Sequence, residues 1–216
     1  DHSLLQPTLP RDALEAGIQV GLDYWVASIC IQPHYLGRCA ALLRESDVRA
    51  STVIGFPLGG NTTTTKVAEA RQALAEGGEE LDMVVNISAV LSGAWDRVQE
   101  DIAAVLAVTH DAGQKLKVIF ENCYLNSNQK IRLCEICSAL CVDWVKTSTG
   151  FGTGGATLDD LKLMCAHTAD AVQVKAAGGI RDLDTLLEIR ALGVTRIGCS
   201  CTAEILEECK QRLGTS

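Results

Sequence analysis

Aromatic residues are scarce in this chain, since Phe, Tyr and Trp together make up 4% of its 216 residues. Any core must therefore consist mostly of Val, Ile, Leu and Ala, which is typical of α/β proteins. Hydrophobic residues still amount to 47% and the mean hydropathy is +0.15, which is enough for a sizeable core. No linker, low-complexity tract or charge block divides the chain, so we expect one domain over residues 1–216.

A basic surface is also lacking. The net charge of −8 argues against nucleic acid as a partner, because no excess of cations is available to neutralise phosphates. The apolar runs fall short of the roughly 18 residues that a membrane span needs, so no membrane partner is expected. Because the chain begins at Asp1 without a methionine, we expect a short leader to precede it in the full-length protein.

Paired metal-binding cysteines are absent, although the chain contains 10 cysteines. There is no pair of Cys-x-x-Cys units and no histidine at zinc-ligand spacing. Cys134, Cys137 and Cys141 instead follow the i, i+3, i+7 spacing of the apolar stripe of one helix. We therefore favour reduced core thiols in a cytoplasmic protein over disulfides or a metal site, and expect neither metal nor cofactor.

A Gly-x-Gly-x-x-Gly sequence does not follow the first strand, which weighs against a dinucleotide-binding fold. Eight strand–helix pairs, each of about 27 residues, fill the chain instead. Near-continuous apolar strands indicate a parallel sheet buried on both faces. Eight such units favour a (β/α)₈ TIM barrel over the main alternative, an open doubly wound sheet. We expect strands over residues 1–5, 24–31, 48–56, 81–87, 116–121, 142–146, 171–175 and 195–198, and helices over 10–22, 33–43, 62–75, 95–109, 127–140, 158–166, 182–191 and 203–213.

Two lysines end apolar runs in the second half of the chain. Lys146 and Lys175 are each followed by small residues and glycine, and they lie 29 positions apart, about one strand–helix–strand step. Adjacent parallel strands would carry both lysines at the same end. Two ammonium groups held close together repel each other, which lowers the pKa of one of them and so favours its neutral, nucleophilic form. The alternative is a pair of solvated surface lysines.

Two carboxylates accompany the lysines. Asp82 lies in an apolar strand, where a charge is costly unless it is paired, and two nearby lysines would pair it. The alternative for Asp82 is a position at the lower rim of the barrel, where it would meet solvent. Glu121 ends the next strand, and it is either a second acid of the site or an ordinary loop residue.

Glycines follow the seventh and eighth predicted strands, where barrels commonly bind phosphate on backbone N–H groups. These are Gly178 and Gly179, and then Gly198 with Ser200; the alternative is that they are turn residues. A lysine pair, one carboxylate and a phosphate cradle suggest imine chemistry on a phosphorylated carbonyl compound. A neutral lysine adds to an aldehyde, and the iminium accepts the electrons of a breaking carbon–carbon bond.

Several segments resemble the deoxyribose-phosphate aldolase family of class I aldolases: residues 1–5, 53–59, 80–86, 145–157 and 174–181. The resemblance runs from residue 1 to about residue 206 and implies a TIM barrel. It also implies a lyase that reversibly cleaves the sugar phosphate 2-deoxy-D-ribose 5-phosphate to D-glyceraldehyde 3-phosphate and acetaldehyde. It leaves open whether the chain forms a homo-oligomer.

The resemblance also implies roles for single residues. Lys146 would be the Schiff-base lysine, Lys175 the second lysine and Asp82 their acidic partner. The phosphate would contact Gly150, Gly178, Gly179, Gly198 and Ser200. Cys201 replaces the family's usual serine by a weaker S–H donor, which we expect to weaken phosphate binding. Two alternatives remain: another lysine-imine aldolase or transaldolase, and a barrel that binds sugar phosphate without turnover.

Overall fold

Eight short strands form one parallel sheet whose order follows the chain from β1 to β8. The computed structural model describes residues 1–214. The sheet closes where β8 meets β1, because His2 pairs with Cys199 and the N–H of Ser3 donates to the Cys199 carbonyl at 2.9 Å. The predicted TIM barrel is confirmed. The strands are β1 (His2–Leu4), β2 (Ser28–Ile31), β3 (Arg49–Ile54), β4 (Glu80–Val84), β5 (Lys115–Ile119), β6 (Trp144–Lys146), β7 (Gln173–Ala177) and β8 (Arg196–Gly198).

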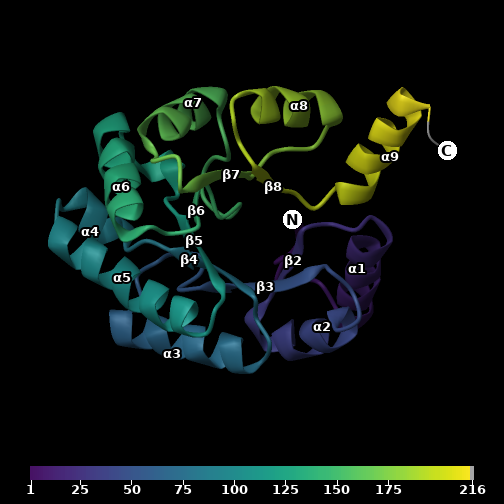
Figure 1. Cartoon of the computed structure of the whole chain (residues 1–216), viewed down its shortest axis with the longest axis horizontal. Helices are drawn as coiled ribbons and strands as arrows, with labels where there is room; N and C mark the ends of the chain where they lie inside the picture. Colours follow the sequence, from purple (N-terminus) through teal and green to yellow (C-terminus); the bar gives the residue numbers. More distant parts are fainter. Residues whose placement is uncertain (215–216) are drawn as a thin grey trace.

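Helices surround these strands as an outer layer (Figure 1). The helix predicted over residues 127–140 is confirmed, and a capping box between Asn126 and Gln129 closes its first turn. None of the helices within residues 1–214 combines the length and apolar character that spanning a bilayer requires. The helices are α1 (Arg11–Asp23), α2 (Leu36–Leu43), α3 (Thr63–Ala75), α4 (Ile87–Leu91), α5 (Trp95–Asp111), α6 (Ser127–Leu140), α7 (Leu158–His167), α8 (Leu183–Ala191) and α9 (Thr202–Leu213), with 3₁₀ turns η1 (Pro33–Tyr35) and η2 (Asn122–Tyr124).

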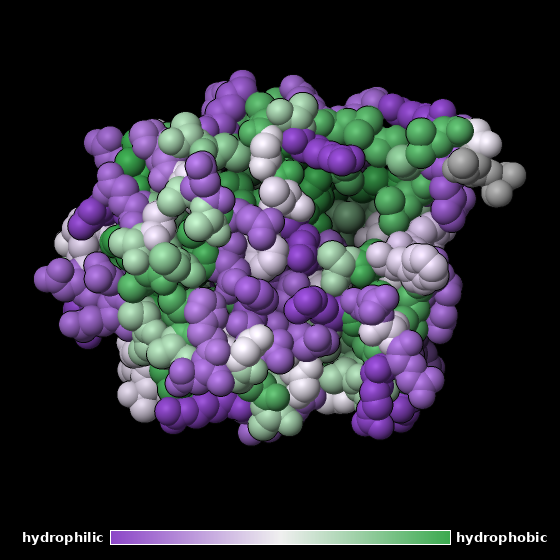
Figure 2. Space-filling view, viewed as in Figure 1, coloured by the Kyte–Doolittle hydropathy of each residue, from purple (hydrophilic) through white to green (hydrophobic). Residues whose placement is uncertain are grey.

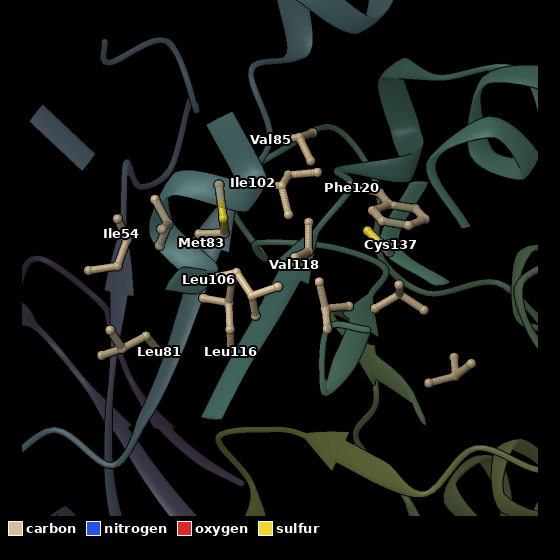
Figure 3. Close-up of a cluster of buried hydrophobic side chains, with 14 of the residues drawn as sticks. Ile54, Leu81, Met83, Val85, Ile102, Leu106, Leu116, Val118, Phe120 and Cys137 are labelled. Atoms are coloured by element: carbon tan, nitrogen blue, oxygen red, sulfur yellow. The ribbon is translucent and has the colours of Figure 1, made fainter. Parts of the chain in front are cut away.

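Alternate residues of the central strands face opposite sides of the sheet. Leu81 and Met83 on β4 and Leu116 and Val118 on β5 belong to the apolar layer that packs against α5, where Ile102 contributes (Figure 3). The residues that alternate with them are polar and face the barrel interior, and they are buried as well: Glu80, Asp82 and Lys117. The main apolar core therefore lies between barrel and helices, and the interior is left for charged side chains.

The strand predicted over residues 24–31 is too long at its start, because β2 begins at Ser28. Tyr24 is the C-cap residue of α1, and Trp25 has a φ of +47° and is 89% exposed, so it lies on the surface. Figure 2 shows apolar residues around a hollow beside α8 and α9, and Trp25 and Leu206 line an apolar groove of about 250 Å³ next to α9. The prediction was wrong because consecutive apolar residues that line a surface groove have the same sequence pattern as a buried strand.

Two further predictions need correction. The strand predicted over residues 81–87 ends at Val84, because the Asn86 side chain accepts the Ala89 N–H at 3.1 Å and starts the short helix α4. Cys134 and Cys137 are buried in α6 as expected, but Cys141 is exposed. It ends the helix in the left-handed conformation, with a φ of +57°, and so leaves the apolar stripe.

Candidate active site

Lys146 and Lys175 are direct partners on neighbouring strands. Lys146 is the last residue of β6, and its register partner on β7 is Lys175. Both residues are nearly inaccessible, with exposed fractions of 3% and 1%. The prediction that adjacent strands bring the two lysines to the same end is therefore confirmed, and the alternative of solvated surface lysines is wrong.

Asp82 joins the two ammonium groups. Its Oδ2 accepts from Lys146 Nζ at 2.7 Å and from Lys175 Nζ at 2.9 Å. Its Oδ1 accepts from Lys117 Nζ at 2.7 Å. The carboxylate is completely buried, so a rim position in contact with solvent is excluded. A buried carboxylate remains ionised only when it is paired and hydrogen-bonded, and these lysines meet that need.

The stagger of the barrel explains how an aspartate early in its strand reaches the lysines. Asp82 is in register with Lys117 on β5, and Lys117 in turn with Trp144 on β6. Lys146 lies two residues beyond Trp144, hence one interior layer higher. Strands of a closed barrel are tilted and sheared, and the Asp82 side chain bridges the two layers.

Lys117 is a site residue that the sequence analysis missed. Besides Asp82, it contacts Glu80 Oε2 at 2.6 Å. Arg196 on β8 contacts the same Glu80 oxygen at 2.9 Å and Asp1 Oδ1 at 2.7 Å, and Asp1 Oδ2 accepts from Lys175. The ion pairs of Lys117, Glu80, Arg196 and Asp1 thus lead back to Lys175 and form one connected network. The signal in the sequence was weak, because Lys115-Leu116-Lys117 is also typical of a surface strand.

The buried charges shift the pKa values of the central groups. Burial lowers the pKa of Lys146, and the charge of Lys175 lowers it further, whereas Asp82 acts in the opposite direction. Burial alone would raise the pKa of Asp82, but the charges of Lys117, Lys146 and Lys175 outweigh it and hold that pKa well below its usual range. Asp82 therefore remains a carboxylate, and Lys146 is the amine made easier to deprotonate.

The balance of charge in this network favours one neutral amine. Within residues 1–214 the connected side chains comprise four cations, Lys117, Lys146, Lys175 and Arg196, and three carboxylates, Asp1, Glu80 and Asp82. A buried excess charge is costly. The network becomes neutral when one lysine loses its proton, and such an amine is a nucleophile.

A cavity of about 180 Å³ opens above the lysines. Lys146 and Lys175 lie on its wall, together with Cys30 and Arg181. All the residues expected to contact phosphate also line it: Gly150, Gly178, Gly179, Gly198 and Ser200. Gly150, Gly178 and Gly179 have φ values of +86°, +86° and +83°, a conformation that directs successive backbone N–H groups in ways other residues rarely allow.

The glycine-rich loops after β6 and β7 touch backbone to backbone. A Cβ atom on Gly155 would lie 2.2 Å from the Gly178 carbonyl oxygen, so only glycine fits there. The N–H of Ala156 donates to the carbonyls of Ala177 and Gly178, both at 3.1 Å. These contacts fix the two loops as one wall of the cavity.

Cys201 has a backbone partner in the loop that follows β7. Its thiol donates to the Ile180 carbonyl at 3.4 Å, and Cys201 is not among the described residues that line the cavity. Within residues 1–214, no group of three or more His, Cys, Asp and Glu side chains is arranged to hold a metal ion. The chemistry that the arrangement offers directly is amine addition to a carbonyl group, with a carboxylate and a second lysine close enough to move protons.

Comparisons with known proteins agree with this geometry. Residues 12–202 match the family model described as DeoC/LacD family aldolase. The deoxyribose-phosphate aldolase of Rhodopirellula baltica is 64% identical over 99% of this chain and 89% of its own length. The deoxyribose-phosphate aldolase of Caldanaerobacter subterraneus is 42% identical over 98% of this chain and 92% of its own length.

A solved structure extends the comparison to the fold. The tetrameric deoxyribose phosphate aldolase of Aeropyrum pernix superposes with a TM-score of 0.90 at 27% identity, over 98% of this chain and 89% of that one. Motifs, fold and lysine geometry thus agree with a match that spans most of the sequence. The chain belongs to the DeoC/LacD family of aldolases.

Proposed function

We propose that this aldolase reversibly cleaves 2-deoxy-D-ribose 5-phosphate to D-glyceraldehyde 3-phosphate and acetaldehyde through a Schiff base on Lys146. The observation that carries the proposal is the sharing of one Asp82 oxygen by Lys146 and Lys175, directly beneath a cavity lined by glycine backbone. The substrate fits this arrangement, because it carries an aldehyde at one end and a phosphate at the other. The relatives' names point to the same substrate.

The reaction follows from the positions of the three charged residues. The neutral Lys146 amine adds to the C1 aldehyde, and loss of water gives an iminium ion. A base removes the proton of the C3 hydroxyl, the C2–C3 bond breaks, and its electron pair moves to the iminium, which becomes an enamine. D-glyceraldehyde 3-phosphate leaves. Protonation of the enamine carbon and hydrolysis of the new iminium release acetaldehyde and restore Lys146.

Lys175 and Asp82 have supporting roles in this scheme. Asp82 is hydrogen-bonded to the Lys146 nitrogen, and Lys175 donates to the same Asp82 oxygen, so a proton acceptor and a proton donor both lie close to that nitrogen. The phosphate would accept N–H and O–H bonds from Gly150, Gly178, Gly179, Gly198 and Ser200. We also propose that residues 1–216 form a single domain and that the protein assembles into a homo-oligomer. The ten free cysteines are consistent with a cytoplasmic location, which we propose as well.

Borohydride reduction in the presence of acetaldehyde tests the proposal. Reduction should trap one acetaldehyde as an ethyl group on the protein, which intact mass measurement detects and peptide mapping should place on Lys146. An adduct on Lys175 would overturn the assignment of roles. The absence of any adduct would instead indicate a barrel that binds sugar phosphate without turnover, and adducts with other aldehyde donors only would indicate a different lysine-imine aldolase.

A further inference from the structure

Glu121 is a buried carboxylate that the chemistry above does not use. It is 1% exposed, and none of the charged side chains within residues 1–214 forms an ion pair with it. Its backbone is left-handed, with φ and ψ of 58° and 61°, which is uncommon for a residue other than glycine. A buried carboxylate in an unusual backbone conformation is costly, so it calls for a specific purpose.

The carboxylate is bonded entirely to the loop that follows Lys146. Its Oε1 accepts the N–H of Thr149 at 3.1 Å, and its Oε2 accepts the hydroxyl of the same threonine. The hydroxyl oxygen of Thr149 in turn accepts the N–H of Phe151 at 3.0 Å. These bonds lie on both sides of Gly150 and so fix the conformation of the backbone at that glycine.

The cavity lies on the other side of this loop. Thr149, Gly150 and Phe151 line it, whereas Glu121 is not among the described residues that do. Gly152 covers the carboxylate, since a Cβ atom on this glycine would lie 3.1 Å from Glu121 Oε2. The loop therefore separates Glu121 from a bound substrate, which argues against its being a second acid of the site.

We infer that Glu121 is a positioning residue, which acts through Thr149 to hold the Gly150 side of the cavity in the shape that recognises the phosphate of the substrate. The inference rests on the proposed function. The left-handed backbone at Glu121 directs the chain so that a side chain at the end of β5 reaches the loop after β6. One carboxylate thus links the loops that follow two neighbouring strands.

The test compares a phosphorylated with an unphosphorylated substrate. Glu121→Ala should lower the ratio of kcat/KM for 2-deoxyribose 5-phosphate to kcat/KM for 2-deoxyribose at least tenfold, mainly through KM for the phosphorylated sugar. Glu121→Gln retains one acceptor for Thr149 and should lower the ratio less. Glu188→Ala, which removes an exposed glutamate on α8, is the matched control and should leave the ratio unchanged.

A double variant tests whether Glu121 acts through Thr149. Thr149→Val removes the hydroxyl at similar volume, and in combination with Glu121→Ala it should lower the ratio no further than the more damaging single change. Multiplied losses would overturn the inference. An equal loss with both sugars, together with a displaced limb in the pH profile, would also overturn it, because that is the behaviour of a second acid.

Adduct trapping separates this inference from the proposed function. One outcome is that reduced acetaldehyde appears on Lys146 in the wild type and in Glu121→Gln, while the ratio of kcat/KM for the two sugars is unchanged in every variant. In that case the positioning role is wrong and the aldolase assignment stands. If the wild type forms no adduct, the proposed function itself fails. Glu121→Gln also keeps the test decisive if Glu121→Ala does not fold.

Discussion

Lys146 and Lys175 are register partners on β6 and β7 that donate to the same oxygen of Asp82, at 2.7 and 2.9 Å. The two ammonium groups repel each other, and Lys175 has a second carboxylate partner in Asp1, whereas within residues 1–214 Lys146 forms its ion pair with Asp82. A third lysine, Lys117, occupies the other oxygen. The Asp82 carboxylate therefore has no free oxygen to offer Lys146, and deprotonation of Lys146 becomes the favourable response.

Lys117→Met should reduce kcat/KM at least tenfold, although Lys117 does not line the cavity among the described residues. The change removes a cation that stabilises ionised Asp82, so the pKa of Asp82 rises and the acidic limb of the pH profile moves to higher pH. Loss of one partner from a buried ionic cluster also costs about 3–5 kcal/mol of unfolding free energy. Chemical denaturation and a pH–rate profile measure the two effects, and Lys115→Met, on the same strand but 48% exposed, serves as control.

Asp82→Asn and Lys175→Leu should shift the pKa of Lys146 in opposite directions. Asp82 raises that pKa and Lys175 lowers it. The pH at which acetaldehyde is half-maximally trapped by borohydride should therefore fall in Asp82→Asn and rise in Lys175→Leu. Turnover should decrease about 10²-fold in both, since each loses a proton-transfer partner.

The rate of adduct formation as a function of pH distinguishes these two variants. Lys162→Leu, on the exposed face of α7, should give the wild-type curve. Shifts of the same sign in Asp82→Asn and Lys175→Leu would contradict the electrostatic origin of the Lys146 pKa.

Gly155→Ala should weaken phosphate recognition although residue 155 contacts no substrate in the proposed scheme. The new methyl group would lie 2.2 Å from the Gly178 carbonyl oxygen, so the two loops must separate. We expect KM for 2-deoxyribose 5-phosphate to increase at least tenfold, and steady-state kinetics measure it. Gly60→Ala is the control, because a methyl group there meets no atom within 4 Å. Equal KM values for the two variants would show that the loops tolerate separation.

Cys201→Ser should change KM for the phosphorylated sugar by less than about threefold. The thiol donates to the Ile180 carbonyl, and a serine hydroxyl can make the same bond with greater strength. Kinetics with both sugars test this expectation. A large and selective decrease of KM for the phosphorylated sugar would instead place the side chain of residue 201 in direct contact with the phosphate.

Acid should destabilise the fold through the buried carboxylates. The pKa values of Glu80 and Asp82 are lowered from 4.5 and 3.8 in the folded protein, although burial alone would raise them, because neighbouring cations outweigh it. Their stabilisation is complete above about pH 5 and is lost as the pH falls toward the folded pKa values, because the unfolded chain then binds protons first. Urea unfolding at several pH values should show a smaller acid dependence in Asp82→Asn than in Asp159→Asn, whose carboxylate is 98% exposed.

Sequence patterns predicted the barrel well because strand–helix alternation is local. They also placed Lys146 and Lys175 together, since adjacent parallel strands end at the same face. They did not reveal Lys117, because a lysine inside a barrel and a lysine on a surface strand have the same spacing. The contact of Asp82 with both lysines could not be predicted either, because it depends on the stagger between strands. The left-handed backbone at Glu121 has no signal in its residue type.

The closure of the barrel has a consequence for how activity arises during synthesis. Asp1, Ser3 and Cys199 line the cavity, and they also help to close the barrel, because the Ser3 N–H donates to the Cys199 carbonyl and the Cys199 N–H donates to the Asp1 carbonyl. Contacts so distant in sequence form late, after the chain between them is ordered. The ribosome releases the amino-terminal part of a chain first. The edge of β1 that pairs with β8 in the folded barrel therefore has no partner until β8 has been synthesised. A nascent chain that has not yet reached Cys199 therefore holds both lysines but not the complete cavity, which forms when β8 pairs with β1.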